Sequence, residues 1–124
     1  MIIDANEIEK GALIQCDLCI IGAGAAGITL AREFDGSGLN VWLLESGSFD
    51  YEQDTQDLYK GSTTGRDYHP LDRTRLRYLG GTTNHWTGIC RPLDEIDFRK
   101  RNWIPDSGWP FDKNHLLPWY KKAQ

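Results

Sequence analysis

The chain is most constrained by an apolar run that leads directly into three closely spaced glycines. Asp-Leu-Cys-Ile-Ile precedes Gly22, Gly24 and Gly27, which follow the pattern Gly-x-Gly-x-x-Gly. The first glycine of this pattern allows a tight turn out of a strand, the second lets the backbone approach a pyrophosphate, and the third lets helix and strand pack closely. We therefore expect a strand over residues 17–22, a helix over 25–35 and a phosphate-binding turn between them.

A second strand and an acidic residue strengthen this interpretation. The predicted helix would open with the N–H groups of Ala25 and Ala26, whose partial positive charge suits a phosphate. Residues 40–45 read Asn-Val-Trp-Leu-Leu-Glu, an apolar run that ends in Glu45. A carboxylate here accepts hydrogen bonds from ribose hydroxyls and repels a 2′-phosphate, which favours FAD or NAD over NADP. Alone, Glu45 could equally be a solvated acid at a strand end, but the glycines favour the ribose role.

Charge and composition exclude several classes of protein. The 124 residues carry a formal net charge of −4 and have a pI of about 5.3, so no basic surface for nucleic acid is expected. The longest uncharged run, residues 18–31, contains three glycines and is too short to span a bilayer. The first residues lack the basic start and apolar core of a secretory signal, so we expect a cytoplasmic protein without a membrane segment.

The spacing of two cysteines indicates a structural role for them rather than a metal site. Cys16 and Cys19 have the CxxC spacing of many metal and redox sites. Residues three apart in or beside a strand point to opposite faces, so the two thiols could not close on one ion. We expect both to be buried structural side chains, and we assign no metal ligand.

The rest of the chain indicates only the beginning of an α/β domain. After Glu45 comes a long polar connection, residues 46–81, with one short helix expected at 51–59. A terminal helix is expected from Lys113, with Asp112 as its N-cap. Because only one βαβ unit is visible, we expect residues 1–124 to be the N-terminal part of one Rossmann-like FAD-binding domain with parallel strands, whose remainder lies outside this chain.

Three arginines alternate with other residues before the second glycine motif. Arg73, Arg75 and Arg77 would share one face of an extended segment. That face could bind an anion or a charged partner elsewhere in the assembly. It could equally be the solvated face of an edge strand, where charged side chains prevent unwanted pairing.

A second glycine motif begins at Gly80 and Gly81. Glycines let backbone N–H groups approach a flat ring or a phosphate, and the residues that follow supply hydroxyls, an amide, an imidazole and an indole. An alternative is a plain glycine turn with Trp86 in the core and His85 bonded to a carbonyl. The candidate ligand contacts after the glycine pair are Thr82, Thr83, Asn84, His85, Trp86 and Thr87.

Taken in order, these motifs resemble the glucose–methanol–choline (GMC) flavin oxidoreductases, and most closely the pyranose oxidase and bacterial sugar dehydrogenase branch. The resemblance is carried by residues 22–27, 45–47, 79–86 and the Ser-Gly-Trp-Pro of 107–110. It implies that FAD lies across the first motif, with Ser46 among its contacts, and that the second motif runs beside the flavin ring. It also implies oxidation of a CH–OH group of a sugar or glycoside by hydride transfer to flavin.

The same resemblance bears on the histidines. His85 occupies the place where some family members attach FAD covalently, and a covalent and a non-covalent role both stay open. The family's proton-abstracting histidine lies near the end of a much longer chain. His69 and His115 match no family motif. We therefore assign no catalytic residue to this chain.

Two rival interpretations remain open. A flavin reductase or monooxygenase would share only the first glycine motif and would give residues 80–88 no role. A non-catalytic nucleotide-binding subunit, or a truncated product, would need a partner chain to cover its strand edges. The interpretation as an FAD-binding oxidoreductase predicts an alcohol or sugar as the substrate. It also predicts that the remaining C-terminal polypeptide or a partner chain completes the protein.

Overall fold

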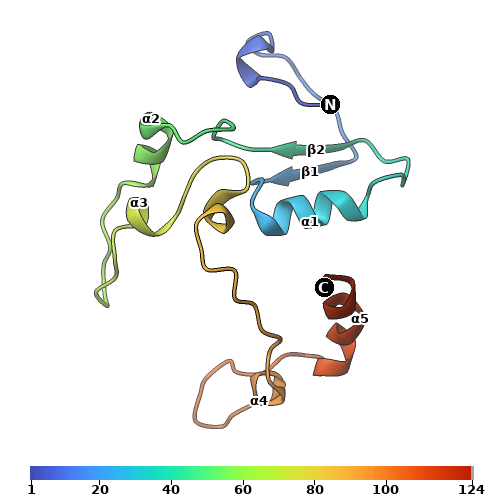
Figure 1. Cartoon of the computed structure of the whole chain (residues 1–124), viewed down its shortest axis with the longest axis vertical. Helices are drawn as coiled ribbons and strands as arrows, with labels where there is room; N and C mark the ends of the chain where they lie inside the picture. Colours follow the sequence, from blue (N-terminus) through green and yellow to red (C-terminus); the bar gives the residue numbers. More distant parts are fainter. Residues whose placement is uncertain (124) are drawn as a thin grey trace. The chain divides into compact units, whose positions relative to one another are not determined.

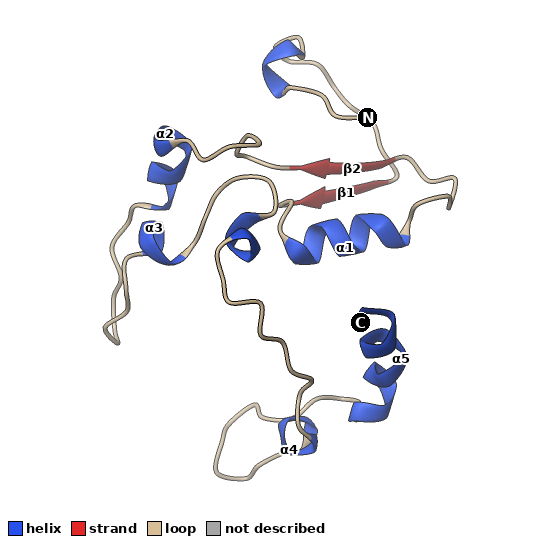
Figure 2. Ribbon diagram, in the orientation of Figure 1, coloured by secondary structure: helices blue, strands red, loops and turns tan. Residues whose placement is uncertain are grey.

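The computed structural model describes residues 1–123, which form two compact units that meet in sequence between Trp86 and Thr87. The first unit contains β1 (Leu18–Ile21), α1 (Ala25–Glu33) and β2 (Val41–Leu44). The strands pair in parallel, and α1 lies along one face of the pair (Figures 1 and 2). The predicted order of strand, glycine turn, helix and strand is confirmed, with each element slightly shorter than expected.

The packing of α1 on the strands depends on the third glycine of the motif. In β1, the side chain of Ile20 is buried. A Cβ atom at Gly27 would collide with the carbonyl oxygen of Gly22 and touch the Leu43 side chain at 3.4 Å. Only glycine lets the first turn of α1 approach the strands this closely. The close-packing role expected for Gly27 is therefore confirmed.

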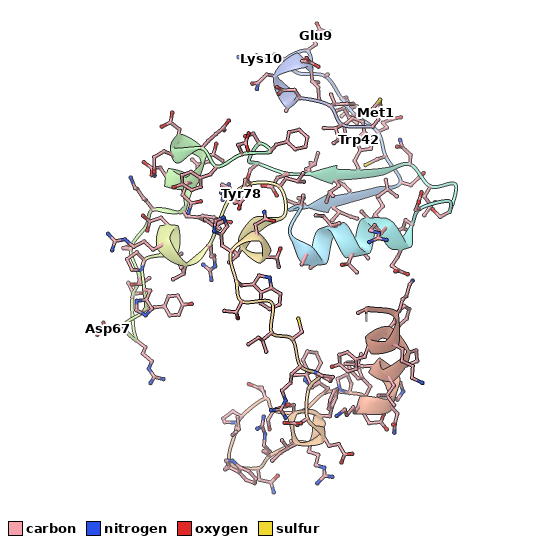
Figure 3. All side chains as sticks on the ribbon, in the orientation of Figure 1. Met1, Glu9, Lys10, Trp42, Asp67 and Tyr78 are labelled. Atoms are coloured by element: carbon pink, nitrogen blue, oxygen red, sulfur yellow. The ribbon has the colours of Figure 1, made fainter. Side chains whose placement is uncertain are left out.

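The other face of the strand pair is open in the described residues. Side chains alternate along a strand, so Ile21 points away from the face of Ile20 and is 84% exposed. Trp42 projects from β2 on the side away from α1 (Figure 3). Cys19 pairs in register with Trp42 and is exposed, and Cys16 is only half-buried. The expectation that both cysteines are buried is wrong, because the described residues do not cover this face.

Short helical turns lie in the segment before β1 and in the long connection after β2. The 3₁₀ turn η1 (Ala5–Glu7) precedes β1. The helix expected at 51–59 is found as α2 (Gln53–Gln56) followed by η2 (Asp57–Tyr59). α3 (Leu71–Thr74) comes next, and η3 (Gly81–Asn84) contains the second glycine motif.

The expected stripe of three arginines on one extended segment is wrong. Arg73 lies in α3, and the chain becomes extended only at Arg75, whose φ is −135° and ψ is 149°. The fixed φ of Pro70 suits the start of a helical turn, and the Thr74 hydroxyl donates to the Pro70 carbonyl at 3.3 Å. This local turn overrides the alternation, and Arg73 is separated from the other two arginines.

The second unit contains α4 (Glu95–Phe98) and α5 (Lys113–Ala123). Phe98 is buried, and its ring centroid lies 6.2 Å from that of Phe111. Asp112 accepts a hydrogen bond from the Asn114 N–H at 2.9 Å, so the predicted N-cap of the terminal helix is confirmed.

Candidate dinucleotide-binding site

The two glycine motifs lie side by side at the carboxyl end of β1. The N–H of Gly80 donates to the carbonyl of Ala23 at 2.8 Å, and Gly24 and Gly80 form an isolated parallel bridge. Gly80 and Gly81 have φ angles of 84° and 59°, in the left-handed region that favours glycine. Motifs far apart in sequence therefore share one surface, at the edge where open α/β sheets bind ligands.

The first motif leaves free space at the N-terminus of α1. Gly22 turns the chain out of β1 with a φ of 98°, and α1 begins directly after Gly24. A Cβ atom at Gly24 would meet no atom within 4 Å. The first N–H groups of a helix have no acceptor within the helix, so those of Ala25 and Ala26 can bind an anion. The pyrophosphate contact expected at Gly24 stays a prediction, and the backbone there carries no side chain that would exclude a phosphate.

Glu45 connects the first glycine turn to the end of β2. Its Oε2 accepts the N–H of Ala23 at 2.8 Å, and its Oε1 accepts the N–H groups of Ser46 and Gly47 at 2.8 and 3.0 Å. Burial alone raises the pKa of Glu45, but the hydrogen bonds from Gly47, Ala23 and Ser46 together hold it below its ordinary value. The side chain is therefore an anion that shapes the site, a role that sequence reasoning missed.

The ribose role of Glu45 stays a prediction. A carboxylate oxygen can accept two hydrogen bonds. Among the described residues, Oε2 accepts one, from Ala23. One acceptor position on Oε2 is therefore available to a ribose hydroxyl.

The polar side chains of the second motif hold their own loop in shape. The Thr82 hydroxyl accepts the N–H of Leu76 at 3.1 Å, the Thr83 hydroxyl donates to the Gly80 carbonyl, and the Asn84 amide donates to the Leu79 carbonyl at 2.8 Å. All three residues are exposed. Their predicted contacts with a ligand remain predictions, whereas their role in fixing the loop is observed.

The aromatic members of this motif are exposed. Trp86 is 52% exposed, so it does not lie in a core as the plain-turn alternative requires. The His85 ring makes an edge-to-face contact with the ring of the buried Tyr78, with 6.2 Å between ring centroids. Thr87 begins the second unit. His115 also lies in that unit, where its Nδ1 is 3.0 Å from the Asp112 carboxylate.

Beside Glu45 lies an open hollow of about 380 Å³. It involves two residues that sequence reasoning did not assign to a site, Tyr59 and Arg77. Alternation singled out Arg77 only as one of three guanidinium groups, and no pattern indicated Tyr59. The lining residues are Ile21, Gly22, Leu44, Glu45, Ser46, Tyr59 and Arg77.

A larger hollow of about 470 Å³ is lined by residues of α1, of the turn after it, and of β2, including Phe34, Asp35 and Val41. Val41 is the first residue of β2, so this hollow reaches the amino end of the strand. Ligands of open α/β sheets bind at the carboxyl ends, so its greater volume does not make it the better candidate. Among residues 1–123, no group of three or more His, Cys, Asp or Glu side chains is placed to hold a metal ion. No helix in the same range is long and apolar enough to cross a membrane.

Comparison with known proteins gives one informative similarity. The chain is 28% identical, over an alignment of 128 residues, to the gluconate 2-dehydrogenase flavoprotein of Pantoea cypripedii. The alignment covers 79% of this chain and 20% of that protein, so the chain spans about a fifth of the relative's length. No family model matches the chain, and no solved structure matches it.

Proposed function

We propose that this chain is the N-terminal, FAD-binding part of a flavin-dependent oxidoreductase that acts on a CH–OH group. The observation that carries the proposal is the hydrogen bond from Gly80 to Ala23, which joins both glycine motifs into one surface beside the start of α1. A protein that used only the first motif, such as a simple reductase, would have no need for this junction. The similarity to a gluconate 2-dehydrogenase flavoprotein supports a flavin-linked oxidoreductase.

Different residues of the site would bind different parts of the cofactor. The N–H groups at the start of α1, next to Gly24, would bind the pyrophosphate. Glu45 would accept a hydrogen bond from the ribose. The loop at Gly80 and Gly81 would border the flavin ring, where glycine backbone allows close approach. Bound FAD supplies the hydride acceptor, and this chain's residues bind and orient it.

The substrate and the class of enzyme belong to the same proposal. The GMC-like order of motifs and the name of the similar flavoprotein both favour a sugar, glycoside or sugar acid as substrate. The histidine that removes the hydroxyl proton would come from polypeptide outside this chain. That polypeptide, or a partner chain, would also cover the sheet face at Ile21 and Leu44, which are 84% and 45% exposed here.

A spectrum followed by a reduction assay tests this function. The purified full-length protein should show the two visible absorption bands of oxidised flavin, and the released cofactor should run as FAD. Anaerobic addition of gluconate, glucose or a glycoside should bleach those bands for at least one compound. A protein without flavin, purified or reconstituted, would contradict the proposal, and flavin bleached only by NADH or NADPH would favour the reductase alternative.

A further inference from the structure

Arg77 holds its guanidinium group over the ring of Tyr59 in the hollow beside Glu45. The guanidinium carbon of Arg77 lies 4.4 Å from the centroid of the Tyr59 ring. Nη1 of Arg77 donates to the Ser46 hydroxyl at 3.0 Å, and that hydroxyl in turn lies 3.3 Å from Oε1 of Glu45 and donates to it. The guanidinium is thus fixed both by a ring and by a hydrogen-bonded link to the predicted ribose acceptor.

No carboxylate among the described residues neutralises Arg77. Its Nε is buried and has no hydrogen-bond partner there. Gln56 contacts the backbone of this segment rather than the charge, since its side-chain amide oxygen accepts the Arg77 N–H at 3.1 Å. A half-buried, oriented and unpaired guanidinium is a typical recognition group, because it is planar, weakly hydrated and stacks on flat rings.

The position of the pair matches one end of the proposed cofactor. The pyrophosphate is placed at Gly24 and the ribose at Glu45, so the base is the next group along the molecule. The hollow lined by Glu45 and Arg77 lies where that base would follow, and its volume of about 380 Å³ is within the range of small-molecule pockets. The guanidinium carbon lies over the Tyr59 ring, so we place a second flat ring on the side of the guanidinium away from Tyr59.

We propose that Arg77 is the platform on which the adenine ring of FAD stacks, with the guanidinium held between the base and Tyr59. This inference rests on the proposed FAD-binding function and extends it to the adenine end of the cofactor. The interaction depends on the planar shape of the group as well as on its charge. A phosphate ligand, in contrast, would need only the charge.

Titration of the flavin-free full-length protein with ADP and with inorganic pyrophosphate separates these roles. Arg77→Lys keeps the charge and removes the plane, so ADP should bind about 5-fold to 150-fold more weakly while pyrophosphate affinity stays unchanged. Tyr59→Leu should also weaken the binding of ADP, whereas Tyr59→Phe should leave the ADP affinity unchanged. Arg66→Lys, at an exposed position, is the matched control. Circular dichroism checks that each variant is folded.

Two results would overturn the inference. Unchanged ADP affinity in Arg77→Lys would show that no base stacks there, and an equal loss for pyrophosphate would make Arg77 a phosphate ligand. If Arg77→Lys does not fold, the comparison of Tyr59→Leu with Tyr59→Phe decides, and equal affinities for ADP would refute the stack. A wild-type protein that binds neither FAD nor ADP would instead refute the proposed function itself.

Discussion

Replacing Glu45 by glutamine should loosen the first glycine turn by an amount that depends on pH. The amide can keep an oxygen toward Ser46 and Gly47, but it then presents an NH₂ group to the N–H of Ala23, where Oε2 now accepts at 2.8 Å. A hydrogen bond to a charged group is worth about 1.5–3 kcal/mol. Glu45 is partly solvated, and screening by water weakens the bond below this range, so we expect a loss of about 1 kcal/mol in the free energy of local opening.

Hydrogen exchange measures this loss where it occurs. At neutral pH, amides in a peptide spanning Ala23 should exchange about fivefold faster in Glu45→Gln than in the wild-type full-length protein. Glu9→Gln is the matched control, because Glu9 is an exposed carboxylate whose side chain makes no hydrogen bond within residues 1–123 (Figure 3).

The pH dependence has a definite sign. The folded-state pKa of Glu45 is lowered, so its stabilisation is fully present above the ordinary pKa of 4.5 and is lost as the pH falls through the lower folded value. The ratio of exchange rates, variant to wild type at equal pH, should therefore fall toward one in acid. A ratio that stays constant from neutral to acidic pH would refute the view that the charged carboxylate holds the turn.

Two further predictions concern the segment around the second glycine motif. Gln56→Leu removes a buried amide that donates to the carbonyls of Asp72 and Arg75 at 2.6 Å each, so exchange should rise across residues 71–77, and unchanged protection there would refute its anchoring role. For His85, acid precipitation and peptide mass measurement decide the mode of attachment: a peptide heavier by one FAD shows a covalent bond, and an unmodified peptide with yellow supernatant excludes it. In either case, His85→Ala should alter the flavin absorption spectrum.

Local sequence patterns predicted the elements well but not how distant segments meet. The glycine spacing and the two apolar runs specified β1, α1 and β2, because turn geometry and close packing depend on neighbouring residues. The hydrogen bond from Gly80 to Ala23 joins segments with no common local pattern. The contact of the Arg77 guanidinium with the Tyr59 ring likewise joins two segments that are separate in sequence.

The errors also have physical causes. The alternating pattern predicted an extended run from Arg73, but Pro70 favours a helical turn there. The buried Gln56 amide stabilises this turn by donating to the carbonyls of Asp72 and Arg75. The burial expected for Cys19 assumed a covered sheet, whereas the described residues place α1 on one face of the strands. In both cases, contacts distant in sequence decided the outcome.

The FAD content of two glycine variants of the full-length protein tests the central claim most directly. A Cβ atom at Gly24 would meet no protein atom within 4 Å, so Gly24→Val should leave the protein folded while occupying the space proposed for the pyrophosphate. Gly61→Val is the matched control, since that glycine is equally unobstructed and lies outside both motifs. We predict that Gly24→Val purifies folded with almost no FAD and that Gly61→Val retains the wild-type amount. A full complement of FAD in Gly24→Val would contradict the assignment of this turn as the binding site of the FAD pyrophosphate.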